Sequence, residues 1–107
     1  MTAHDDLGVR WPAFSLAVQL GNVGSEVDRA IAAWAAQRSD RFDRALARAL
    51  ELFDLTARDE RWRGHRRREI LRAREEFCRL FFDNDVASGA ARTLREYFLQ
   101  FALLARR

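Results

Sequence analysis

The sequence predicts an all-α protein, folded as an antiparallel four-helix bundle of up-down-up-down topology. Apolar residues recur at helical spacing over four stretches, and no stretch alternates with the period of two that a half-buried strand requires. Only one proline and five glycines interrupt the 107 residues, which leaves room for long helices. A chain of this length builds one core, and short connections between helices favour the up-down-up-down arrangement.

The first helix is expected at about 13–37, after an N-terminal tail of residues 1–12 that we expect to be flexible. Gly21 and Gly24 interrupt this helix, each at a cost of roughly 1 kcal/mol relative to alanine. Either they let a neighbouring helix approach closely, or the helix breaks there. The apolar seam keeps its phase across both glycines and therefore favours a continuous helix. The seam consists of Leu16, Leu20, Val23, Val27, Ala30 and Trp34.

Three further helices are expected at about 40–57, 66–82 and 88–105, which places residues 13–107 in one domain. Ser39 or Asp40 is the expected N-cap of the first of these and Ser88 that of the last, while Gly64 supplies a turn between two of them. Eight phenylalanines and three tryptophans are more than a core of this size needs. We therefore expect some of them at a subunit interface, in a homo-oligomer.

Eight arginines lie between Arg58 and Arg74, and with three acids they give this segment a charge of +5, against +3 for the whole chain. Guanidinium groups suit phosphates and carboxylates and stack on flat rings. Arginine beside tryptophan is typical of a surface that stacks an unpaired base and neutralises its phosphate. The alternative is that Trp62 closes one end of the bundle. The candidate nucleic-acid-binding residues are Arg61, Trp62, Arg63, His65, Arg66, Arg67 and Arg68.

Arg74 is a candidate for a buried ion pair, because it lies on the apolar stripe of its helix between Ile70 and Phe77. An arginine there either extends along its aliphatic stem to solvent or forms a buried ion pair. The acids available on the earlier helices are Glu26, Asp28, Glu51 and Asp54.

The composition argues against an enzyme. General acid–base catalysis needs a positioned pair of titrating groups, and the chain has only two histidines. Its single cysteine, Cys78, lies among phenylalanines and is expected to be buried. Since zinc spacings and glycine-rich phosphate loops are missing as well, we expect no metal and no cofactor.

One enzymatic alternative stays open, because Arg58 and His65 fit the loose spacing of the motif of HEPN ribonucleases. The resemblance implies an RNA-cleaving toxin that depends on His65. The location is predicted as cytoplasmic: the first fifteen residues do not resemble a signal peptide, and no apolar run is long enough to span a membrane.

Four stretches carry a further resemblance: S-L-A-V-Q-L-G-N-V-G-S-E-V-D-R-A, R-A-L-E-L-F-D-L-T, R-E-I-L-R-A-R-E-E-F-C and Y-F-L-Q-F-A-L-L-A-R. Together they span most of residues 15–106 and resemble a family of small bacterial four-helix proteins. That family is similar in size, helix count and basic character to the accessory variability determinant (Avd) of diversity-generating retroelements and to the 23S rRNA intervening-sequence proteins. The resemblance implies a pentameric ring that binds a reverse transcriptase and template RNA through basic surfaces.

The sequence as a whole predicts a non-catalytic accessory protein that forms a homo-oligomer and binds nucleic acid, RNA rather than DNA, as a partner of a reverse transcriptase. The alternative is a purely structural protein–protein interaction module. In that case the arginines would pair with acidic residues of a neighbouring subunit.

Overall fold

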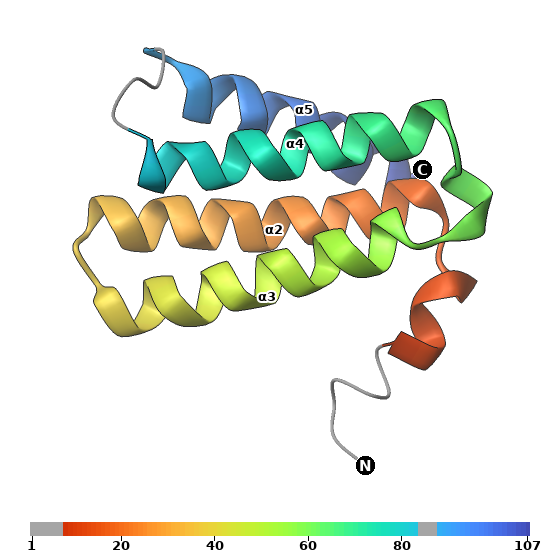
Figure 1. Cartoon of the computed structure of the whole chain (residues 1–107), viewed down its shortest axis with the longest axis horizontal. Helices are drawn as coiled ribbons and strands as arrows, with labels where there is room; N and C mark the ends of the chain where they lie inside the picture. The colour runs from red at the N-terminus through yellow and green to blue at the C-terminus, as the bar shows by residue number, and fades with distance from the viewer. Residues whose placement is uncertain (1–7, 84–87) are drawn as a thin grey trace.

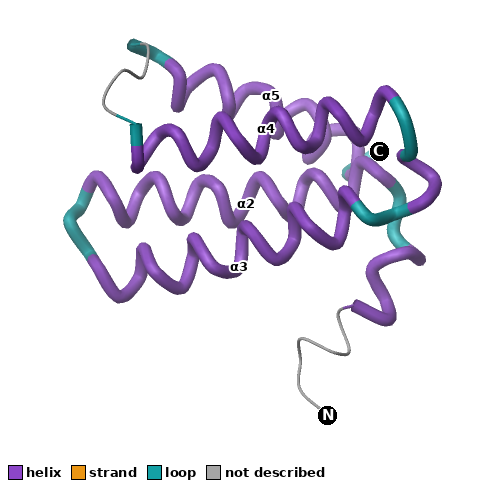
Figure 2. Tube along the Cα trace, in the orientation of Figure 1, coloured by secondary structure: helices purple, strands orange, loops and turns teal. Residues whose placement is uncertain are grey.

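The computed structural model describes residues 8–83 and 88–107. Every regular element in this part of the chain is helical, which confirms the all-α class (Figure 2). None of the described helices is long and apolar enough to cross a membrane. The elements are η1 (Trp11–Ala13), α2 (Leu16–Ala35), α3 (Ser39–Ala57), η2 (Glu60–Trp62), α4 (His65–Phe82) and α5 (Ala90–Ala105).

The helix ends lie within three residues of those expected, and the differences have local causes. Ser15 is the N-cap of α2, where its Oγ accepts a hydrogen bond from the Val18 amide at 3.2 Å. The cap expected at Ser88 is wrong: Gly89, in the left-handed conformation with φ +83°, precedes the first residue of α5. Gly64, with φ +91°, makes the expected turn before α4.

The packed part of the chain begins earlier than residue 13. Residues 1–7 of the expected tail lie outside the described residues, but residues 8–10 are helical. Trp11 is buried, and its indole Nε1 donates a hydrogen bond to Thr56 Oγ1 at 3.0 Å. Phe14 packs edge-on against Trp11, with ring centroids 5.6 Å apart. The end of the expected tail is therefore part of the core.

Helix α2 is continuous through Gly21 and Gly24, which confirms the first alternative for these glycines. A Cβ atom on Gly24 would lie 2.5 Å from Phe98 Cβ, and one on Gly21 would lie 3.3 Å from Ala102 Cα. Both neighbours belong to α5. The two glycines thus allow α5 to approach the backbone of α2 closely.

Helix α4 packs against α3 and α5. Phe77 and Ile70 of α4 are fully buried, and the ring of Phe77 lies 5.8 Å from that of Phe53 on α3. The loop between α2 and α3 lies at one end of the molecule, and η2 with the start of α4 lies at the other (Figure 1). The chain therefore brings Arg61 to Arg68 to one end.

Several large apolar side chains stay accessible. Trp34, the last residue of the expected seam, is 48% exposed, and Phe82 is 67% exposed. Trp34, Phe42 and Phe81 form an aromatic cluster with ring centroids 4.8 to 5.3 Å apart. This cluster lies near the loop that joins α2 to α3, away from the arginine-rich end.

Candidate nucleic-acid interface

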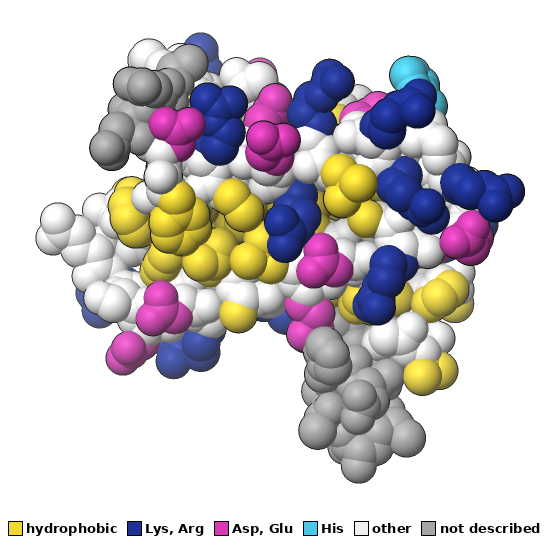
Figure 3. All heavy atoms as spheres, in the orientation of Figure 1, with side chains coloured by type: hydrophobic (Ala, Val, Ile, Leu, Met, Phe, Trp, Pro, Cys, Tyr) yellow, Lys and Arg dark blue, Asp and Glu magenta, His cyan; other side chains and the backbone are white. Residues whose placement is uncertain are grey.

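The candidate residues lie on η2 and the first turn of α4, at the end of the molecule that we call the basic end (Arg61 to Arg68). Figure 3 shows arginine side chains gathered on this end. Asp59 organises the start of η2: its side chain accepts a hydrogen bond from the Arg61 amide at 3.0 Å. The candidates differ in how far their side chains are already engaged within the chain.

Arg61 is held in one orientation. Its Nη2 lies 2.8 Å from Asp59 Oδ2 and donates to the Phe14 carbonyl at 2.7 Å, while its guanidinium covers the Trp62 ring at 4.4 Å. Hydrogen bonds from Arg61 lower the pKa of Asp59 to about 2, against the opposing effect of burial. The same hydrogen bond raises the pKa of Arg61.

Trp62 is half-buried and packs against the core. Its indole Nε1 donates to Gln19 Oε1 at 2.8 Å, and the guanidinium of Arg61 lies over its ring. This arrangement favours the alternative in which Trp62 closes the end of the helices.

Gln19, which was not among the residues predicted from the sequence, connects the basic end to the core. Gln19 is fully buried, and its Nε2 donates to the Trp11 carbonyl at 2.9 Å and to Asp59 Oδ2 at 3.0 Å. With the bond from Trp62, both ends of the amide are satisfied. The available signal was a polar residue on the apolar face of its helix, three residues after Leu16 and four before Val23.

Arg67 is also engaged in structure. Its Nε donates to the Ala57 carbonyl at 2.6 Å and its Nη2 to the Asp59 carbonyl at 3.4 Å. The last carbonyls of a helix have no partner within the helix and carry the negative end of its dipole. Arg67 therefore caps the end of α3, and its Nε and Nη2 groups are engaged within the chain.

Three further arginines of the basic end reach solvent and make no hydrogen bond to the backbone among the described residues. Arg63 is 76% exposed, and its contact with Glu60, itself exposed, is long at 3.6 Å. Arg66 pairs with Glu69 at 2.9 Å on the surface of α4. Arg68 is exposed, with its Nη2 3.3 Å from Nδ1 of His65, the exposed first residue of α4.

Glu69 links the basic end to α5. Its Oε1 accepts one hydrogen bond from the Arg66 guanidinium and another from the Tyr97 hydroxyl, the latter at 2.5 Å. Burial and this hydrogen bond raise the pKa of Tyr97, so the phenol stays protonated. Arg66 also lies 5.9 Å from the ring centroid of Phe101, which places the last turns of α5 beside the start of α4.

Arg74 lies on α4 and pairs with Asp54 of α3, with Nε and Oδ1 3.0 Å apart. The Arg74 side chain is 35% exposed and that of Asp54 54%, so the pair is half-exposed rather than buried. Cys78 is half-buried at the edge of the core. Across residues 8–83 and 88–107, no group of histidine, cysteine and acidic side chains is arranged to hold a metal ion.

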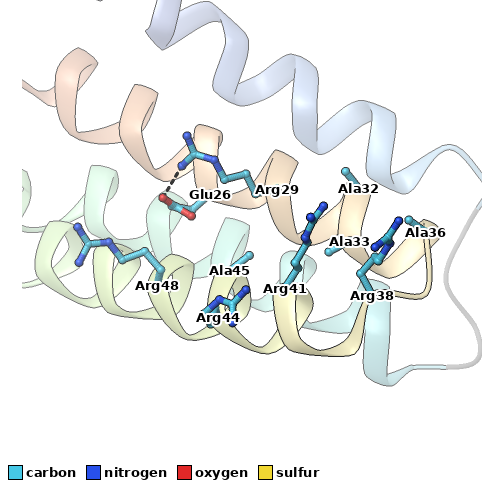
Figure 4. Close-up of a pocket in the computed structure, with 10 residues that line it drawn as sticks. All are labelled: Glu26, Arg29, Ala32, Ala33, Ala36, Arg38, Arg41, Arg44, Ala45 and Arg48. Atoms are coloured by element: carbon cyan, nitrogen blue, oxygen red, sulfur yellow. Dashed lines mark hydrogen bonds and ion pairs between the residues drawn. The ribbon is translucent and has the colours of Figure 1, made fainter.

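A second basic surface lies between α2 and α3, and the sequence analysis did not identify it. It is a groove of about 820 Å³, which we call the arginine groove (Figure 4). The available signal was the spacing of Arg41, Arg44 and Arg48 at intervals of three and four, which puts them on one face of α3. Its charged lining residues are Glu26, Arg29, Arg38, Arg41, Arg44 and Arg48.

A scan of protein-family models and searches of curated proteins and of solved structures gave no match to this chain. The likeness to Avd therefore stays a prediction.

Proposed function

We propose that this protein is a non-catalytic helical accessory protein that binds nucleic acid, RNA rather than DNA, through its basic end. The observation that carries the proposal is the set of solvent-reaching guanidinium groups of Arg63, Arg66 and Arg68 at one end of the molecule. Clustered arginine attracts the phosphate backbone whatever the base sequence.

The acids of the basic segment do not neutralise it. Asp59, Glu60 and Glu69 have arginine partners within the segment, yet the segment keeps a formal charge of +5. Arg106 and Arg107 follow α5, whose C-terminal end lies at the same end of the molecule (Figure 1). Their charges add to the field that would draw a polyanion to this end.

We propose that the four long helices form an antiparallel up-down-up-down bundle. The support is the connection of α2 to α3 at one end and of α3 to α4 at the other, with α5 packed against α2 and α4. We assign no catalytic role to His65, because the side-chain contact it makes among the described residues is with the guanidinium of Arg68.

The same proposal predicts that the protein forms a homo-oligomer and has a reverse transcriptase as its partner. The exposed Leu99 and Leu103, one turn apart on α5, are apolar side chains that a second copy of the chain would cover. Static light scattering at micromolar concentration tests the oligomer, which a monomer mass would contradict.

The test of nucleic-acid binding is a fluorescence-anisotropy titration of a labelled oligouridylate with two charge-matched variants. One carries Arg63→Gln, Arg66→Gln and Arg68→Gln at the basic end. The control carries Arg72→Gln, Arg79→Gln and Arg92→Gln on α4 and α5. Arg61 and Arg67 are left in place because they hold the fold together.

We expect the first variant to bind about tenfold more weakly than the control, with a salt dependence reduced by about 2 in the slope of log K against log salt. Equal affinity of both variants would remove the basic end from the proposal. A wild-type protein that does not bind the oligonucleotide at low salt would favour the protein-interaction module instead.

A further inference from the structure

We infer that the arginine groove between α2 and α3 is a second nucleic-acid site, which binds the phosphate backbone of a single strand. This inference rests on the proposed nucleic-acid binding. The groove lies toward the α2–α3 loop, whereas the basic end lies at the α3–α4 connection. The two sites are therefore separate surfaces that variants can address one at a time.

The groove carries more positive charge than its surroundings neutralise. Arg29 pairs with Glu26 at 2.6 Å, and Arg48 pairs with Glu51 at 3.0 Å. The remaining lining arginines form no ion pair with any residue that the structure describes; they are Arg38, Arg41 and Arg44. Unpaired guanidinium groups along one groove favour an anionic ligand.

The shape of the groove favours an extended anion over a compact one. Figure 4 shows arginines contributed by both helices, with small side chains between them. Arg41, Arg44 and Arg48 extend over about 10 Å along α3, at 1.5 Å per residue. One phosphate group is too short to contact that row, whereas successive phosphates of a strand can. The small lining residues are Ala32, Ala33, Ala36 and Ala45.

A second hollow suggests a single strand rather than a duplex. It has a volume of about 520 Å³, and Arg38 and Ala33 line both it and the groove. Trp34 lines the hollow and is 48% exposed, and its ring is held by Phe42 and Phe81. A fixed, accessible indole beside a row of arginines can stack an unpaired base, which a duplex does not offer.

The test compares three triple variants in the oligouridylate titration, each checked for helix content by circular dichroism. The groove variant carries Arg38→Gln, Arg41→Gln and Arg44→Gln; glutamine keeps nearly the helix propensity of arginine. The other two are the basic-end variant and the α4–α5 control described above. We expect the groove variant to bind about tenfold more weakly than the control. We also expect the slope of log K against log salt to be less steep by about 2.

Trp34→Leu gives an independent readout. We expect it to weaken oligouridylate binding by about fivefold or more, the loss of one base stack, and to leave the affinity for a duplex of equal length unchanged. Equal weakening for single strand and duplex would overturn the stacking role. Competition by oligoglutamate as effective as that by oligouridylate would overturn nucleic acid as the ligand of the groove.

The outcomes separate the two proposals. If the groove variant binds like the control while the basic-end variant binds weakly, the inference fails and the proposed function stands. If the wild-type protein does not bind the oligonucleotide at all, both fail.

Discussion

At the scale of single residues, one buried amide holds three segments of the chain together. Gln19 of α2 bonds to the Trp11 carbonyl of η1, to Asp59 ahead of η2 and to Trp62 within it. The segments that position Arg61 to Arg68 therefore depend on a side chain more than forty residues away in sequence. This dependence makes Gln19 a sensitive point of the fold.

We expect Gln19→Ala to lower the free energy of unfolding by about 2 to 3 kcal/mol, because it leaves the Trp62 indole without its partner and removes the hydrogen bonds to the Trp11 carbonyl and to Asp59. Urea denaturation followed by circular dichroism measures the change. Asn22→Ala is the control on the same helix, since its side chain is exposed and bonds to the Val18 carbonyl of its own helix. Equal stability of the two variants would show that the amide is dispensable.

Asp59 makes the stability of the basic end depend on pH. Its pKa in the folded protein is about 2, below the ordinary value of 3.8. A lowered pKa stabilises the fold above the ordinary value and loses that contribution as pH falls from about 4 to about 2. The contribution is about 1 kcal/mol once solvent screening of its half-exposed partner Arg61 is considered.

Denaturation midpoints measured between pH 5 and pH 2 test this contribution. We expect Asp59→Asn to be less stable than the wild type at pH 5, and the difference to shrink as the pH approaches 2. A constant difference over this range would mean that Asp59 does not act through its charge.

At the scale of helices, the sequence pattern predicted the four long elements because each has an apolar stripe at helical spacing. The phase of the seam through Gly21 and Gly24 was enough to predict a continuous α2. The cap of α5 was missed because serine is a common N-cap, whereas here Gly89 supplies a left-handed turn. The start of the packed chain was missed because Trp11 precedes the periodic pattern and contacts Thr56, far along the chain.

The close contact of α2 with α5 predicts that alanine at Gly24 destabilises the protein, whereas helix propensity alone predicts that it stabilises the protein. Alanine favours a helix over glycine by about 1 kcal/mol, yet a Cβ on Gly24 would lie 2.5 Å from Phe98 Cβ. We therefore expect Gly24→Ala to destabilise the protein by about 2 kcal/mol in urea denaturation. Gly21→Ala is the matched control with a smaller effect, because its nearest neighbour would be 3.3 Å away. A Gly24→Ala variant more stable than the wild type would contradict the close approach.

At the scale of the molecule, arginine is divided between structural and surface roles. Arg61 and Arg67 bond to backbone and carboxylate groups of the chain, although the sequence groups them with the ligand-binding candidates. Charge density alone does not separate the two roles, since each of these arginines also bonds to a carbonyl outside the arginine-rich segment, Phe14 for Arg61 and Ala57 for Arg67.

The arginine groove was missed for a related reason. Its residues come from two helices and the loop between them, within residues 1–60, where seven arginines and ten acidic residues give a net charge of −3. The acidic residues that make this charge negative include Asp54 of α3, which pairs with Arg74 of α4 and does not line the groove. Folding thus separates charges that are mixed in the sequence.

The central claim is that the basic end and the groove bind phosphates, and the salt dependence of oligouridylate binding to the wild-type protein tests it most directly. About three phosphate contacts at each surface predict a slope in log K against log salt near −2 for a strand bound at one surface and near −4 for a strand that contacts both. No binding at low salt, or an affinity that does not change with salt, would contradict the claim.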